Sequence, residues 1–126
     1  MKKYRFLPLI LVGLLVMNSC EKDYLTKKKV EITTPVSFAT DIVPIMTEDC
    51  SIAGCHVNGG PPPNLTAAKA YDELTGLGYV DTSNAEQSLL YKRITATVAP
   101  MPPAAPMSAE EIGYILAWIK QGAQNN

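Results

Sequence analysis

Apolar and polar positions divide the 126-residue chain into three parts. A run of twelve mainly apolar residues covers 6–17, and a polar, charged stretch covers 21–35. From Val36 onward, apolar residues recur at helical spacing, and convincing strand alternation is absent. This pattern predicts one all-α domain over 36–126, built from three to five helices joined by long loops.

The helices of this domain are placed by their start and stop signals. They are expected over 38–48, 67–75 and 85–95, and a fourth helix is expected to begin after residue 108. Pro44 predicts a kink or a late start in the first helix, because proline has no main-chain N–H. The expected caps are, in chain order, Ser37 or Thr40, Thr66, Ser83 or Asn84, and Ser108. The expected inward residues of the last two helices are Leu89, Leu90, Ile94, Ile112, Ile115, Leu116 and Ile119, with Tyr114 and Trp118 beside them.

The first part of the chain has the order of residues typical of an export signal. Basic residues precede the apolar run, which is too short to span a bilayer comfortably. Asn18-Ser19-Cys20 follows and resembles the lipobox of bacterial lipoproteins. The resemblance implies a signal peptide over 1–19, a lipidated Cys20 and a polar tether over 20–35; the alternative is an ordinary cleaved signal with a leftover cysteine. We therefore expect a lipid-anchored protein of the cell envelope, periplasmic or at the cell surface.

The charge of the chain bears on its partners. Eight Lys and Arg residues and twelve Asp and Glu residues follow Cys20, which gives a net charge of −4. An acidic surface repels phosphate backbones and favours basic or neutral partners. We expect no binding to nucleic acid.

The motif that carries chemistry is Cys50-Ser-Ile-Ala-Gly-Cys55-His56, which holds the only histidine of the chain. Two cysteines with a histidine directly after the second form the attachment pattern of a c-type haem. The thiols can add to the haem vinyl groups, and the imidazole can reach the iron. The usual spacing has two residues between the cysteines, whereas this chain has four. A metal-free disulfide between Cys50 and Cys55 is an alternative, and a zinc site would lack a fourth ligand.

A second iron ligand is expected on the opposite face of the haem. Met101 lies between Pro100 and Pro102, in a loop before the last helix, and a methionine thioether is a soft, neutral ligand. Two other methionines have structural explanations, because Met46 fits the apolar face of the first helix and Met107 can pack onto the last helix. Met101 is therefore the candidate ligand.

The order of these segments between Ser37 and Ala123 resembles the small class I cytochrome c domains of bacterial lipoproteins. The resemblance rests on 37–45, Cys50 to His56, 86–91, Met101-Pro102-Pro103 and 108–123. It implies one covalent haem c, with Cys50 and Cys55 as thioether positions, His56 as the proximal ligand and Met101 as the distal ligand. It also implies a first helix that crosses the last one, with the haem between them. The departure from the family pattern is the four-residue spacer.

These expectations point to a membrane-tethered electron carrier rather than an enzyme. Single electrons would pass through an exposed haem edge to redox partner proteins, and the acidic surface would steer docking. Two alternatives stay open. One is a haem sensor or peroxidase-like module with a displaceable distal ligand, and the other is a disulfide-stapled structural lipoprotein domain without haem.

Overall fold

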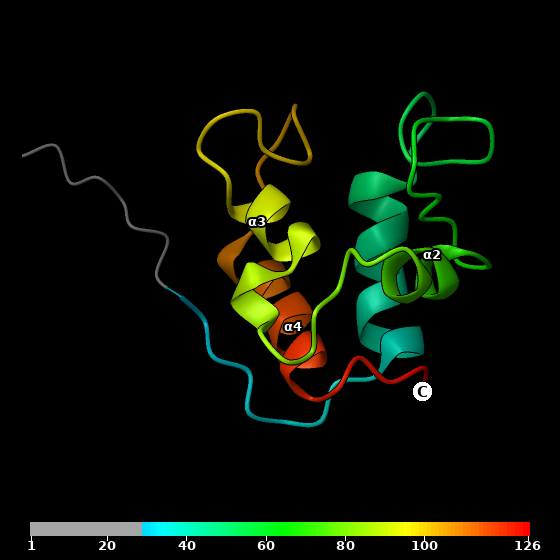
Figure 1. Ribbon diagram of the computed structural model, residues 1–126. Helices are drawn as coiled ribbons and strands as arrows, with labels where there is room; N and C mark the ends of the chain where they lie inside the picture. Colours follow the sequence, from blue (N-terminus) through cyan, green and yellow to red (C-terminus); the bar gives the residue numbers. More distant parts are fainter. Residues whose placement is uncertain (1–28) are drawn as a thin grey trace, which may run out of the picture.

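The computed structural model describes residues 29–126, which form four α-helices and no strand (Figure 1). The predicted all-α class is therefore confirmed for this part of the chain. The expected signal peptide over 1–19, the lipidated Cys20 and the tether up to residue 28 lie outside the described residues. Among the described helices, none is both long and apolar enough to cross a bilayer. The helical elements are η1 (Phe38–Ile42), α1 (Val43–Ile45), η2 (Met46–Cys50), α2 (Ala70–Gly76), η3 (Ala85–Gln87), α3 (Leu89–Thr95) and α4 (Ala109–Lys120).

The first helix runs without interruption through η1, α1 and η2 and ends at Cys50. Ser37 caps it, as expected, because its hydroxyl accepts the main-chain N–H of Thr40. The turns on both sides of Pro44 are wider than those of an α-helix and have π-helical hydrogen bonds. Proline lacks an N–H and its ring crowds the preceding turn, and a wider turn accommodates both effects. Pro44 is therefore absorbed within one helix, and Cys50 stands at its last turn.

Helix α4 begins as the sequence predicts. Ser108 and Glu111 form a capping box, in which the Ser108 hydroxyl accepts the Glu111 N–H and the Glu111 carboxylate accepts the Ser108 N–H. The expected inward residues of this helix are confirmed, because Ile112, Ile115, Leu116, Trp118 and Ile119 are all buried.

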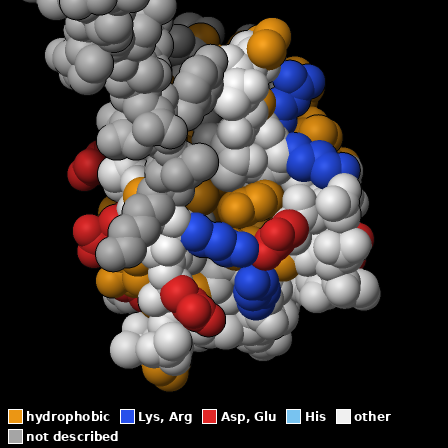
Figure 2. Space-filling view, turned by 90° about the vertical axis from the view of Figure 1, so that its left-hand side faces the viewer, with side chains coloured by type: hydrophobic (Ala, Val, Ile, Leu, Met, Phe, Trp, Pro, Cys, Tyr) orange, Lys and Arg blue, Asp and Glu red, His pale blue; other side chains and the backbone are white. Residues whose placement is uncertain are grey.

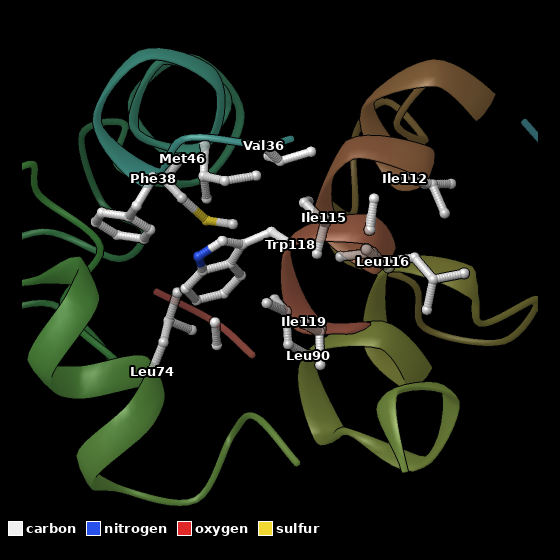
Figure 3. Close-up of a cluster of buried hydrophobic side chains, with 14 of the residues drawn as sticks. Val36, Phe38, Met46, Leu74, Leu90, Ile112, Ile115, Leu116, Trp118 and Ile119 are labelled. Atoms are coloured by element: carbon white, nitrogen blue, oxygen red, sulfur yellow. The ribbon is translucent and has the colours of Figure 1, made fainter. Parts of the chain in front are cut away.

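Trp118 lies at the centre of the core, where the first helix, α2 and α4 meet. Figure 3 shows its indole beside Phe38 and Met46 of the first helix and above Leu74 of α2. The rings of Phe38 and Trp118 have centroids 5.1 Å apart, and the Phe38 ring meets Tyr71 edge-on at 5.2 Å. These aromatic contacts hold the start of the first helix against the end of α4.

The two middle helices differ from the prediction in their boundaries. The helix expected over 67–75 begins at Ala70, because the Thr66 hydroxyl donates to the Asn64 side chain instead of capping the helix. The helix expected over 85–95 is broken at Ser88, which has extended backbone. The helix restarts at Leu89, whose side chain is 44% exposed, whereas Leu90 and Ile94 face the core. The expectation that Leu89 faces inward was therefore wrong.

A strap formed by residues 30–36 lies along α4 before the first helix starts. The Gln121 amide anchors it, because it accepts the Val36 N–H and donates to the Thr34 carbonyl. The Val30 carbonyl approaches α4 so closely at Gly113 that a side chain there would overlap it. The last residues of the expected tether therefore pack against the domain.

Candidate functional site

The two cysteines and the histidine are held on one loop that follows the first helix. Ile52 to Cys55 forms a turn, in which the Cys55 N–H donates to the Ile52 carbonyl at 2.9 Å. The His56 N–H then reaches back to the Cys50 carbonyl at 3.1 Å. A further hydrogen bond, from the Leu65 N–H to the His56 carbonyl, fastens the loop to buried Leu65. The motif residues are therefore brought together by the main chain itself.

The return of this loop depends on a close approach between two backbone segments. The Gly60 N–H donates to the Val57 carbonyl, and a Cβ on Gly60 would overlap the Cys55 carbonyl. Only glycine fits that position without a shift of the loop. The segment after the motif is thus folded tightly against it.

The imidazole of His56 is oriented by the proline-rich segment that follows it. Its Nδ1 lies 3.1 Å from the Pro61 carbonyl oxygen and 3.0 Å from the Pro63 carbonyl oxygen. Carbonyl oxygens only accept hydrogen bonds, so Nδ1 carries the proton and donates. In the neutral ring, Nε2 then holds a lone pair and is able to bind a metal ion.

Both thiols of the motif are reduced and unbonded. Cys50 is buried, whereas Cys55 is half-buried. Burial raises the pKa of the Cys50 thiol to about 11, and the nearby charges of Asp49, Cys55 and Glu111 act in the same direction. Cys50 therefore stays protonated at neutral pH, which slows thiolate-dependent disulfide exchange.

A pair of carboxyl groups lies beside Cys50, where the end of the first helix meets the start of α4. Burial raises the pKa of Asp49, and the negative charges of Glu111 and Glu48 raise it further. The Asp49 Oδ2 atom is buried and forms no hydrogen bond with the described residues. An ionised Asp49 is thus disfavoured at this position.

Met101 lies on a second loop, over 96–108, between α3 and α4. Its main-chain N–H donates to the Arg93 carbonyl at 3.0 Å, and its side chain is 36% exposed. Within residues 29–126, no hydrogen bond or ring contact joins Met101 to the cysteine and histidine loop. Figure 1 shows both loops rising from the same end of the helices, the cysteine loop on the right and the methionine loop on the left.

Large apolar side chains are exposed on both of these loops. Ile52, between the two cysteines, is 48% exposed, and Val98, on the methionine loop, is 84% exposed. Together with Met101 they account for three of the five exposed large hydrophobic residues of the described chain; the other two are Leu77 and Leu89. These three side chains lie on the two loops that rise from the same end of the helices.

The sequence identified the cysteines, the histidine and the methionine, but not the groups that orient them. Pro61 and Pro63 act through main-chain carbonyls, and no residue pattern reveals which carbonyl faces an imidazole. Asp49 is adjacent to Cys50 in the sequence, but its pairing with Glu111 depends on the packing of two helices. Among the described residues, no group of three or more His, Cys, Asp or Glu side chains is arranged to hold a metal ion by itself.

The chain was compared with protein-family models, curated proteins and solved structures, and none of them matches. Its function must therefore be argued from its own residues and their arrangement.

Proposed function

We propose that this protein is a membrane-tethered c-type cytochrome that carries single electrons, with one haem c attached through Cys50 and Cys55. His56 would be the proximal ligand and Met101 the distal ligand. The haem supplies a reversible one-electron iron couple, and the chain's own residues attach, orient and shield it.

The observation that carries this proposal is the fixed tautomer of His56. The carbonyls of Pro61 and Pro63 hold the Nδ1 proton, so Nε2 is left as the ligating atom. Two carbonyl oxygens that both accept a hydrogen bond from Nδ1 are not expected around a histidine at a random surface position. The hydrogen bond from the His56 N–H to the Cys50 carbonyl also holds the main chain of His56 next to that of the first cysteine.

The thiols fit covalent attachment better than the alternatives. Each sulfur would bond to one vinyl carbon, and its hydrogen would pass to the neighbouring vinyl carbon, so the addition needs no oxidant. Both thiols are free for this reaction, and Cys50 sits at a rigid helix end. A thiol held as rigidly as Cys50 limits the number of orientations that the attached group can adopt.

The exposed apolar side chains of the two loops support a haem held between them. Ile52 lies on the same loop as His56, and Val98 lies on the same loop as Met101. A porphyrin is a large apolar plate, and burying these side chains against it would stabilise the domain. Thioether ligation by Met101 would draw the methionine loop over the second face.

The test is the maturation product of a host that attaches c-type haem. We expect haem staining that survives denaturing electrophoresis and an intact mass increased by one haem. The variant with Cys50→Ala and Cys55→Ala should lose both signals. A colourless mature protein, lighter by two hydrogens through a Cys50–Cys55 disulfide, would contradict the proposal and favour the structural lipoprotein domain.

A second candidate, a haem sensor or peroxidase-like module, is favoured by one observation. Met101 is 36% exposed, and the one hydrogen bond that the described residues give it is made by its main-chain N–H, as expected of a displaceable ligand. Met101→Ala separates the two functions. A changed ligation spectrum supports the electron carrier, whereas an unchanged spectrum with rapid binding of carbon monoxide supports the sensor.

A further inference from the structure

The basic residues of the described chain gather on one side of an otherwise acidic domain. Residues 29–126 contain five Lys and Arg residues and ten Asp and Glu residues. Four of the basic residues lie directly before the strap or on α3 and α4, and only Lys69 lies elsewhere, next to α2. The four are Lys29, Lys92, Arg93 and Lys120, and all four are exposed. Figure 2 shows Lys and Arg side chains, with Asp and Glu side chains among them, on the side of the molecule where α3 and α4 lie.

The strap brings the membrane-proximal chain to this same side. Lys29 forms an ion pair with Glu86 at 2.6 Å, and Lys120 lies 3.4 Å from the same carboxylate oxygen. One carboxylate therefore meets two ammonium groups, and a positive charge remains. Lys92 and Arg93 form no ion pair with the described residues and lie on the solvent side of α3, opposite buried Leu90 and Ile94.

A shallow hollow of about 490 Å³ opens between the strap and α4 on this side. Its apolar lining comes from Val30, Ile32, Leu116 and Ala117, and Lys29 and Lys120 stand at its edge. An apolar floor with lysines beside it matches the interface of a bilayer, where ammonium groups meet phosphates and apolar groups enter between the headgroups.

We infer that this basic face, defined by Lys29, Lys92, Arg93 and Lys120, rests on an anionic phospholipid bilayer. The inference rests on the lipid anchor at Cys20 in the proposed function. Lys29 is the ninth residue after Cys20, so the anchor holds the face within about 30 Å of the membrane. Lys27 and Lys28 precede Lys29 directly in the sequence. Each basic group near an anionic surface strengthens docking about fivefold.

Docking in this orientation leaves the cysteine and histidine loop accessible. The loop with Cys55 and His56 lies on the side of the molecule away from α3 and α4 (Figure 1). The acidic remainder of the surface would then face away from the bilayer, towards basic redox partners.

The test uses the full lipidated protein in vesicles of neutral phosphatidylcholine, with or without phosphatidylglycerol. Lysine acetylation is followed site by site with mass spectrometry. We expect Lys92 and Lys120 to be protected on anionic vesicles only, and the protection to disappear at about 0.5 M salt. Lys69, on the other side of the domain, is the internal control and should be acetylated equally on the neutral and the anionic vesicles.

Variants sharpen the test. Replacing Arg93 by Gln should lower the ratio of docked to undocked protein about fivefold, whereas Lys69→Gln should leave this ratio unchanged. The ratio is measured from the acetylation of Lys120. Equal acetylation of Lys92 and Lys120 on both vesicles, with the lipid present on Cys20, would overturn the inference and leave this face for a protein partner. An intact mass without lipid would instead remove the anchor itself, and the docking with it.

Discussion

The main-chain N–H of His56 donates a hydrogen bond to the carbonyl oxygen of Cys50, with 3.1 Å between the two atoms. This bond explains how the motif tolerates four residues between its cysteines. The turn from Ile52 to Cys55 accommodates the additional length, and the chain returns to Cys50 before the histidine. The main chain of His56 therefore stays next to that of Cys50 despite the longer spacer.

Gly60→Ala tests whether the tight return of this loop matters. A methyl group there would overlap the Cys55 carbonyl, so we expect a loss of about 1–3 kcal/mol of unfolding free energy. Urea unfolding measures the loss, and haem staining should show less attachment. Gly76→Ala is the control, because a Cβ at Gly76 meets no atom within 4 Å, and its stability should be unchanged or slightly raised. Equal stability of the two variants would contradict the close approach.

Trp118→Ala tests the centre of the core. The indole is buried and its Nε1–H donates to the Gln124 carbonyl at 2.9 Å, so the loss should be about 3–5 kcal/mol. Thermal unfolding measures it. If that variant does not fold, Ile115→Val tests the same core at a fully buried position. It should lower the free energy of unfolding by about 0.5–1.5 kcal/mol. Leu77→Ala, at an exposed position, should change little, and a normal melting curve for Trp118→Ala would show that α4 is misplaced.

Ser88→Ala tests the break between η3 and α3. The buried Ser88 hydroxyl accepts the Asp81 N–H at 2.8 Å and lies 3.3 Å from the Asp81 carbonyl, to which it donates. Its removal leaves that N–H unsatisfied, and we expect a loss of about 1–3 kcal/mol in urea unfolding. Exposed Ser83→Ala should stay within about 0.5 kcal/mol of the parent protein. A similar small effect for Ser88→Ala would mean that water replaces the hydroxyl.

Asp49→Asn tests the carboxyl pair beside Cys50 through its pH dependence. Burial and the negative charge of Glu111 raise the pKa of Asp49 above its ordinary value in the folded protein. The folded state therefore binds the proton more tightly, so the stability that Asp49 contributes in acid is lost as the pH rises through its folded pKa.

At neutral pH, Asp49→Asn should thus stabilise the protein, and the gain should shrink as the pH falls from neutral into the acid range through the pKa of Asp49. Urea unfolding across this pH range provides the measurement. The exposed Asp72→Asn variant, on α2, is the control and should lack such a gain. A gain for Asp49→Asn that is the same at every pH would contradict the assigned titration.

The sequence by itself determined the local features, whose hydrogen bonds join residues within one helical turn of each other. The start of α4 was predictable because Ser108 and Glu111 satisfy each other's main-chain groups across three residues. The cap at Ser37 is equally local, because its hydroxyl accepts an N–H three residues on. The buried stripe of α4 was predictable because helical periodicity determines which residues share a face. The cysteine and histidine positions were readable from spacing alone.

Only the tertiary structure decided how distant segments meet. The exposure of Leu89 depends on the break at Ser88, which exists because a buried hydroxyl satisfies Asp81 in another loop. The tautomer of His56 depends on two carbonyls brought back by a turn, and the position of the strap depends on Gln121, 85 residues from Val36. Such contacts join groups that local sequence does not place, so they are defined only when the helices pack.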